Sequence, residues 1–127
     1  MINELSKKIH SNNKAKGFYD SEKNIGEILA LIHSEVSEAL ECDRKDKYAI
    51  PIGTKSADTI GNCFENDDTA FQIEFEVWVK DTFEDELADI MIRVMDLAAF
   101  KGINLETHIK AKMRYNALRP HKHGNKY

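Results

Sequence analysis

Along most of this chain, hydrophobic residues recur with the spacing expected of a helix. Between Lys23 and about Asp46, apolar residues recur about every 3.6 residues, which predicts an amphipathic helix. The same period returns from Phe83 to about Phe100. There the sequence Thr-Phe-Glu-Asp, beginning at Thr82, is typical of a helix start, and Gly102 of a helix end. These two segments are the clearest helices of the chain.

Shorter helices are predicted at both ends of the chain. The first covers residues 4–12, and Ser21 is expected to cap the long helix that follows the next loop. The last helix runs from Leu105 to about Leu118, with Asn104 as its cap and Pro120 closing it.

The stretch between the second and third helices, about residues 48–81, has a different pattern. It contains Pro51 and Gly53 and few periodic positions, which indicates mostly loop. Within it, residues 71–80 (FQIEFEVWVK) alternate apolar with polar, which predicts a short strand paired in a hairpin with residues 49–52. The expected fold is therefore all-α: a four-helix bundle with an inserted loop and short β segment.

The composition is that of a soluble globular protein. The chain has 127 residues, 42% hydrophobic and 31% charged, which fits a single domain over residues 1–127. No stretch approaches the roughly 20 apolar residues of a membrane helix, and the N-terminus lacks a signal-peptide core. Two cysteines, Cys42 and Cys63, form neither a disulfide framework nor a zinc-site pattern. We therefore expect a cytoplasmic protein without a membrane partner.

Charge is unevenly distributed. The net charge is −4, but Lys110–Tyr127 carries six Lys or Arg residues and no acid, leaving 12 basic against 22 acidic residues elsewhere. Such asymmetry is consistent with a phosphate-rich partner for the basic end, or with a tail that folds back on an acidic site. The alternative is a disordered tail, over about residues 119–127, that only adds solubility.

Each of the two clearest helices carries two acids three residues apart, beside its apolar stripe. The pairs are Glu35 with Glu38 and Glu86 with Asp89. Residues at this spacing lie about 60 degrees apart around a helix, so both members of a pair point to the same side. If the helices pack through their apolar stripes, all four carboxylates meet at one edge of the interface.

Carboxylates at one edge repel one another unless a cation or protons neutralise them. At about 5 Å and an effective dielectric constant near 20, each like-charged pair costs roughly 3 kcal/mol. Hard divalent cations prefer oxygen ligands, so a site without histidine favours Mg²⁺ or Mn²⁺ over zinc. A di-iron site is disfavoured because no Glu-x-x-His sequence occurs. The alternative is that both pairs are solvated surfaces of a non-catalytic helical interaction module.

The last predicted helix presents groups suited to phosphate. Lys112, Asn116 and Arg119 follow at intervals of four and three residues, so they share a face. They offer a point charge, an amide and a planar guanidinium fork. A site with acid-bound metal on one side and cationic side chains on the other suits phosphoanhydride chemistry, in which negative charge develops on several phosphate oxygens. Nucleic-acid binding is a weaker alternative, because the rest of the chain is acidic and only Tyr115 interleaves the basic run.

Three patterns occur in order along the chain: E-x-x-E in LIHSEVSEALE, E-x-x-D in EDELADIMIRVMDLA and K-x-x-x-N-x-x-R in KMRYNALRPHKHG. Together they resemble the MazG-like all-α nucleoside triphosphate pyrophosphohydrolases. The stretch from KGFYD to ALECDRK is also similar to the N-terminal part of that family. The resemblance covers nearly the whole chain except about residues 48–80.

The resemblance implies an oligomeric helical bundle, a homodimer or homotetramer. Such proteins cleave nucleoside triphosphates between the α and β phosphates with Mg²⁺, giving a monophosphate and pyrophosphate. Carried over by motif, the metal ligands would be Glu35, Glu38, Glu86 and Asp89, with Glu38 a candidate to orient the attacking water instead. The phosphate- or sugar-binding residues would be Lys112, Asn116 and Arg119, and Lys16 and Phe18 are candidates near the base.

The chain departs from the family pattern in the length of its insertion. The link between the two acidic motifs contains an insertion of about 30 residues, whereas compact members have a short link. The insertion is interpreted as a lid over the nucleotide, an oligomerisation arm or an ornament. Its apolar run favours an arm or lid that packs through Phe75 and Trp78.

Overall fold

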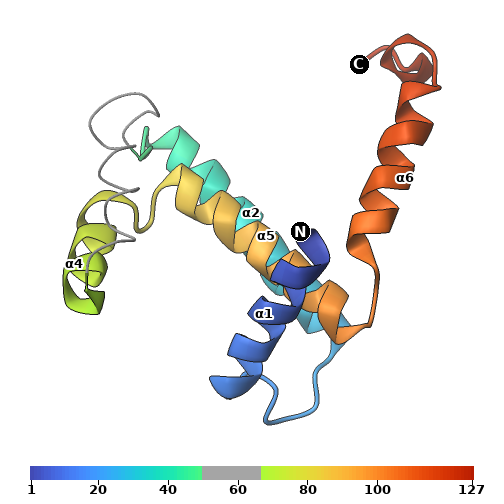
Figure 1. Ribbon diagram of the computed structural model, residues 1–127. Coiled ribbons are helices and arrows are strands. Elements are labelled where there is room, and N and C mark those ends of the chain that lie inside the picture. Colours follow the sequence, from blue (N-terminus) through green and yellow to red (C-terminus); the bar gives the residue numbers. More distant parts are fainter. Residues whose placement is uncertain (50–66) are drawn as a thin grey trace. The chain divides into compact units, whose positions relative to one another are not determined.

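The structure is a computed structural model that describes residues 1–49 and 67–127 (Figure 1). In these ranges it contains five α-helices and no strand. They are α1 (Ile2–Ala15), α2 (Ile25–Arg44), α4 (Asp68–Trp78), α5 (Phe83–Phe100) and α6 (Leu105–Ala117), and a 3-10 turn, η1 (His121–Gly124), follows α6. The predicted all-α class is confirmed for the described residues. None of the helices in these ranges is long and apolar enough to cross a membrane.

Helix α2 begins at Ile25, later than the sequence pattern predicted. The predicted cap, Ser21, lies outside the helix, and Asn24 caps it instead. The side-chain oxygen of Asn24 accepts hydrogen bonds from the backbone N–H groups of Gly26, at 2.7 Å, and Glu27, at 3.3 Å. Both N–H groups lack a partner within the helix, so these bonds fix the first turn of α2.

The predicted starts of α5 and α6 are confirmed. The hydroxyl oxygen of Thr82 accepts a hydrogen bond from the backbone N–H of Asp85 at 3.4 Å. The side-chain oxygen of Asn104 accepts one from the backbone N–H of Thr107 at 3.1 Å. Pro120 lies just beyond α6, as expected of a residue that cannot continue a helix.

The predicted strand over residues 71–80 is wrong, because most of this segment belongs to helix α4. The side chain of Asp67 caps the helix and accepts a backbone hydrogen bond in its first turn at 2.9 Å. Phe71 and Phe75 lie one turn apart, with ring centroids separated by 5.9 Å. The cap and this aromatic pair outweigh the apolar–polar alternation. Most of the predicted hairpin partner, residues 49–52, lies outside the described residues.

Contacts between residues divide the chain into two compact units. The first contains Met1–Lys23 and Ile92–Tyr127, and the second contains Asn24–Met91. The first half of helix α5, up to Met91, therefore belongs to the second unit, and the half from Ile92 onward belongs to the first unit.

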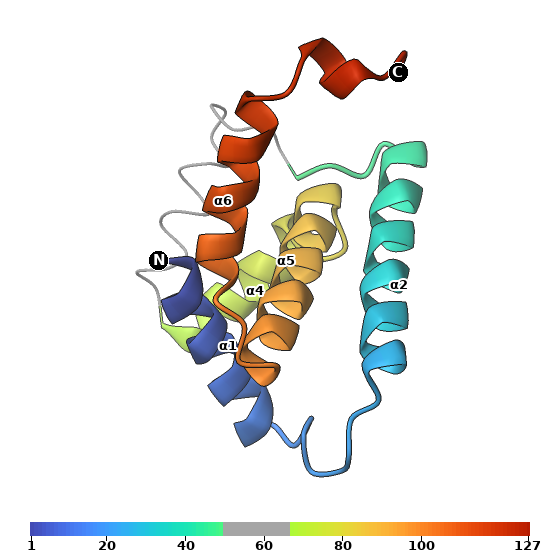
Figure 2. The ribbon, with the colours of Figure 1, turned by 90° about the vertical axis from the view of Figure 1, so that its right-hand side faces the viewer.

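In the first unit, α1 packs against the beginning of α6 (Figure 2). The terminal amino group of Met1 donates to a carboxylate oxygen of Glu106 at 3.1 Å. The side-chain amide of Asn3 donates to the side-chain oxygen of Asn104 at 2.7 Å. These polar contacts tie the N-terminus to the start of the last helix.

In the second unit, α2 and the first half of α5 run alongside each other in opposite directions (Figures 1 and 2). The backbone N–H of Phe83 donates to the carbonyl oxygen of Lys47 at 2.8 Å. The backbone N–H of Ala49 donates to a carboxylate oxygen of Glu84 at 2.7 Å. Because the end of α2 is held at the start of α5, the middle of α2 lies opposite the first turns of α5.

The buried apolar side chains of the described residues are few, and most are small. They are Ala39, Cys42, Ala49, Met95 and Ala98. Val36 and Leu40, on the apolar stripe of α2, each remain 49% exposed. By contrast, the carboxylates of Glu35 and Glu86 are buried. The second unit thus buries acids while leaving large apolar side chains partly open.

Candidate metal centre

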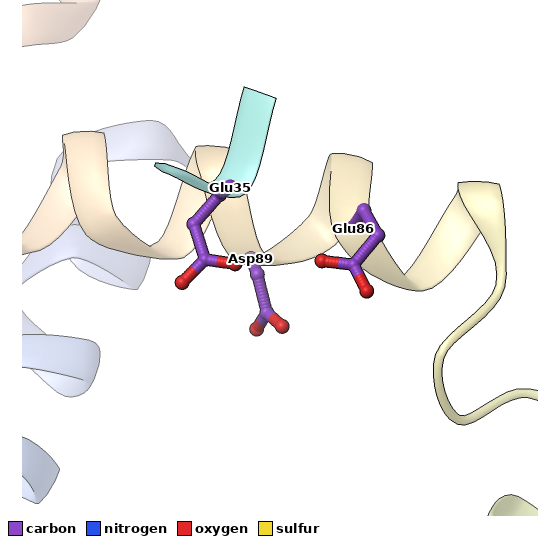
Figure 3. A group of neighbouring side chains, drawn as sticks. All are labelled: Glu35, Glu86 and Asp89. Atoms are coloured by element: carbon purple, nitrogen blue, oxygen red, sulfur yellow. The ribbon is translucent and has the colours of Figure 1, made fainter. Parts of the chain in front are cut away.

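Three acidic side chains from two helices meet in the second unit. Glu35 comes from the middle of α2, and Glu86 and Asp89 come from the first turns of α5 (Figure 3). One carboxylate oxygen of each residue lies within 4.8 Å of the other two. Figure 3 shows the carboxylate of Asp89 between those of the two glutamates. The structure therefore brings together three of the four acids that the sequence pattern singled out.

The helix geometry explains the meeting of these side chains. Glu86 and Asp89 are three residues apart on α5, so they share a face. The antiparallel pairing of α2 with α5 places Glu35 opposite that face. Glu35 and Glu86 are each only 7% exposed, and Asp89 is half-buried. Burying ionised carboxylates is costly unless protons, hydrogen bonds or a cation compensate their charge.

The electrostatics of the group are visible at Glu86. Its pKa is raised to about 7, first by burial and then by the charges of Glu38, Asp89 and Glu35. Burial and neighbouring negative charge both disfavour the ionised form of a carboxyl group. Near neutral pH, Glu86 therefore exchanges a proton readily, and a cation bound at the group would displace that proton.

The donor set of the group fits a hard divalent cation. All three residues offer carboxylate oxygens, which Mg²⁺ and Mn²⁺ prefer. Carboxylates supplied by two helices can contact one ion from two sides, and the partial exposure of Asp89 leaves one side open to solvent. The residues present therefore fit a Mg²⁺ or Mn²⁺ site.

Cys42, also buried on α2, does not change this assignment. Burial raises the pKa of its thiol, and the charge of Glu86 raises it further. The thiol donates a hydrogen bond to the carbonyl oxygen of Asp81 at 3.5 Å. A protonated thiol engaged in this way is a poor metal ligand, so Cys42 supports the end of α2 rather than a zinc site.

Glu38 is placed differently from the other three acids. Its side chain is exposed, and it lies outside the group whose oxygens are mutually close. Nevertheless, after burial, its charge is the largest contribution to the raised pKa of Glu86. Glu38 therefore lies near enough to act on the group electrostatically while remaining open to solvent.

The phosphate-binding candidates belong to the first unit, where Lys112 and Asn116 lie on α6 and Arg119 lies just beyond its end. Lys112 Nζ lies 5.1 Å from the ring centroid of Tyr115, and Arg119 Cζ lies 5.7 Å from it. The side-chain oxygen of Asn116 is buried and has no hydrogen-bond partner among the described residues. The two predicted cations, Lys112 and Arg119, thus both lie against the ring of Tyr115, the single aromatic residue within the basic run.

Lys16 and Phe18, which the family resemblance suggests as contacts for a nucleobase, also lie in the first unit. Lys16 is exposed and forms the C-terminal cap of α1. Phe18 is 60% exposed, so it is not a core residue. Their placement leaves both side chains open to solvent.

A polar cluster in the first unit was missed by the sequence pattern. Asp96 accepts hydrogen bonds from His10 Nδ1 at 2.7 Å, Asn13 Nδ2 at 2.9 Å and the Tyr19 hydroxyl at 2.8 Å. The Tyr19 ring lies 5.1 Å from that of Phe100, centroid to centroid. Burial raises the pKa of Tyr19, and its bond to Asp96 raises it further. The available signal was Asp96 itself, an acid seven residues beyond Asp89 on the same helix.

The acidic group can hold a divalent cation and, without one, can take up a proton near neutral pH. The Tyr115 cluster can offer cationic and amide groups to an anion. These two chemistries are the ones that the sequence placed on separate helices. Comparison of the chain with family models, with curated proteins and with solved structures gives no match.

Proposed function

We propose that the protein is a Mg²⁺-dependent nucleoside triphosphate pyrophosphohydrolase. It would hydrolyse NTPs or dNTPs between the α and β phosphates, giving a nucleoside monophosphate and pyrophosphate. The observation that carries the proposal is the group of Glu35, Glu86 and Asp89, whose oxygens lie within 4.8 Å of one another. The order of the acidic and basic motifs, which resembles that of MazG-like pyrophosphohydrolases, supports the same activity.

The acidic group suits this reaction because triphosphate chains bring negative charge of their own. Mg²⁺ bound there would neutralise charge that develops on the phosphate oxygens. Glu35 and Glu86 would hold the ion from the buried side, and Asp89 from the partly open side. A site with two buried acids and one half-buried acid leaves room for phosphate oxygens to approach.

Glu38 is the proposed acceptor for the proton of the attacking water. Its carboxylate is exposed, one turn from Glu35, so solvent reaches it. A general base must lie within reach of the water that it activates, and the metal group is within its electrostatic range. Glu38 would thus orient and deprotonate water, while the other acids hold the cation.

Lys112, Asn116 and Arg119 are the proposed phosphate- and sugar-binding residues. The stacking of Lys112 and Arg119 on Tyr115 limits the freedom of both cations, which lowers the entropy lost on binding an anion. The side-chain oxygen of Asn116, which is buried and has no hydrogen-bond partner among the described residues, is suited to a hydroxyl donor of a ligand.

A homo-oligomer, a dimer or tetramer, is part of the proposal. Within the second unit, Val36, Leu40, Leu87 and Met91 are between 44% and 49% exposed. Covering such side chains stabilises an assembly by about 25 cal/mol for each square ångström of apolar surface. The same observation favours the alternative, a helical interaction module without catalysis, so a metal test has to separate the two.

The test is a panel of NTPs and dNTPs incubated with Mg²⁺, with separate analysis of pyrophosphate and phosphate. Pyrophosphate and monophosphate should form together, and Glu35→Gln or Asp89→Asn should abolish their formation. Glu27→Gln, the same change at an exposed position of α2, is the matched control and should retain activity. No product with any triphosphate, and no effect of Mn²⁺ on thermal stability, would favour the interaction module.

A further inference from the structure

A cavity of about 600 Å³ in the second unit adjoins the acidic group. One of its walls is α4, which presents Phe71, Gln72 and Phe75. The lining residues from the start of α5 include Asp85 and Asp89. Asp89 is thus shared between the cavity and the candidate metal centre. A cavity of this volume is typical of sites for small molecules.

Two aromatic side chains form an apolar surface in an otherwise acidic cavity. The rings of Phe71 and Phe75 are 5.9 Å apart, centroid to centroid, with 37° between their planes, and both are half-buried. Most other lining groups are carboxylates, and Lys80 is the one cation among the described lining residues. Its ammonium lies 3.3 Å from Asp81, which is a lining acid as well.

Charge in the cavity constrains the orientation of a nucleotide. The nucleoside part of a triphosphate is neutral, so the acids along the wall do not repel it. The lining acids repel the phosphate part except where a metal cation is held, because the charge of Lys80 is already paired with Asp81. The end of the cavity that meets Asp89 is therefore the phosphate end, and the Phe71–Phe75 surface is the nucleoside end.

We propose that α4 forms the nucleobase-binding wall of the active site, with the base of the triphosphate against Phe71 and Phe75 and its phosphates toward Asp89. This assignment rests on the proposed function and extends it to α4, which lies between the two acidic motifs in the sequence. It makes α4 a substrate-binding helix. Stacking on phenylalanine tolerates any base, so the wall contributes affinity more than base selection.

The two faces of α4 allow a matched comparison. Phe71 and Phe75 line the cavity, whereas Ile73 and Val77, on the same helix, are 58% and 64% exposed and do not line it. If alanine substitutions acted only by destabilising α4, they would have similar effects at all four positions. A loss of nucleobase stacking would affect only the cavity-lining pair.

The experiment measures calorimetric binding of an α,β-methylene triphosphate, which blocks the proposed cleavage, in the presence of Mg²⁺. Phe71→Ala and Phe75→Ala should each weaken binding about 5- to 150-fold, the range expected for one stacked base. Phe75→Tyr should retain it, and Ile73→Ala and Val77→Ala should bind like the wild type. KM for the corresponding hydrolysable triphosphate should rise in parallel, with kcat much less changed.

The outcomes separate the two proposals. Equal binding by wild type and Phe71→Ala/Phe75→Ala, or equal losses in the Ile73 and Val77 controls, would overturn the nucleobase wall alone. Binding that depends on the phenylalanines, without hydrolysis of any triphosphate, would overturn the activity and retain the wall. Absence of nucleotide binding by the wild type would overturn both.

Discussion

Glu35 and Glu86, both buried, lie on different helices with carboxylate oxygens within 4.8 Å of each other. At an effective dielectric constant near 20, two full charges at that distance repel by roughly 3 kcal/mol. The pairing of α2 with α5 is fixed by hydrogen bonds from the backbone N–H groups of Phe83, to the carbonyl oxygen of Lys47, and of Ala49, to the carboxylate of Glu84. It holds the two acids together against this repulsion. A proton or a divalent cation relieves it, so stability, pH and metal binding are coupled at this group.

Stability of the metal-free protein should therefore decrease, as far as Glu86 contributes, when pH rises from about 4.5 to about 7. Glu86 titrates at an ordinary 4.5 when unfolded, but burial and its acidic neighbours raise its pKa to about 7 in the folded chain. Between these values the folded state keeps a proton that the unfolded state has released, so lower pH favours folding. Above about pH 7 that stabilisation is lost.

The variant Glu86→Gln isolates this contribution. It carries no charge at any pH, so at about pH 8 without metal it should be about 1–3 kcal/mol more stable than the wild type, since one pKa unit corresponds to about 1.4 kcal/mol. Urea unfolding at several pH values measures the difference. Glu27→Gln should leave the pH profile unchanged. A Glu86→Gln profile parallel to that of the wild type would show that this carboxyl is not the titrating group.

Affinity for Mn²⁺ should increase as pH rises through about 7. Below that value a proton on Glu86 competes with the ion, and above it the carboxylate is available as a ligand. Titration of Mn²⁺, followed by electron paramagnetic resonance, should give about tenfold stronger binding for each pH unit below the pKa of Glu86 and a plateau above it. Glu86→Gln should bind weakly at every pH. Equal affinity on both sides of neutrality would contradict the role of this proton.

The local parts of the fold could be predicted from the sequence because their causes are local. Thr82 and Asn104 cap α5 and α6 as expected, since each accepts a hydrogen bond from a residue three positions later. The segment 71–80 was misjudged because its residues fit two periods at once. Its alternation predicts a strand, whereas the Asp67 cap and the Phe71–Phe75 spacing select a helix.

The site could be predicted only in part, because burial depends on how helices pack. Spacing placed Glu35 and Glu38 on one side of α2, but only Glu35 is buried, and Glu38 remains exposed. The partners of Asp96 could not be deduced, since His10 and Tyr19 lie far from it in the sequence. Helical periodicity fixes which residues share a face and does not fix which distant residues meet that face.

Removing a cationic side chain from the last helix should reduce catalysis without changing the affinity for the metal ion. Lys112→Met should lower kcat/KM for the preferred triphosphate about 10- to 100-fold, as expected for loss of one charged hydrogen bond to phosphate. Its Mn²⁺ affinity should equal that of the wild type, because Lys112 contributes none of the three carboxylates that hold the ion. Lys110→Met, the same change two residues earlier on α6, is the control. Equal losses in both variants would point to overall charge instead.

The Asp96 cluster should contribute to stability and not to metal binding. Asp96→Ala leaves the donors of His10, Asn13 and Tyr19 without this acceptor, so the free energy of unfolding should fall by about 2–4 kcal/mol. Tyr19→Phe removes one of the three bonds and should cost about 1 kcal/mol. In the Asp96→Ala background Tyr19→Phe should have little further effect, because the two residues share one interaction. Additive losses in urea unfolding would show that the bond between them contributes little.

Disrupting the apolar stripe of α2 should dissociate the proposed homo-oligomer. Val36 and Leu40 are each 49% exposed, and burial of a leucine or valine side chain contributes about 1.5–3 kcal/mol. Leu40→Lys replaces that gain with the cost of desolvating a charge, so light scattering should show a shift toward the monomer at micromolar concentration. Leu118→Lys, at a 78% exposed position after α6, is the control and should leave the mass unchanged. A wild type that is monomeric at every accessible concentration would contradict the oligomer.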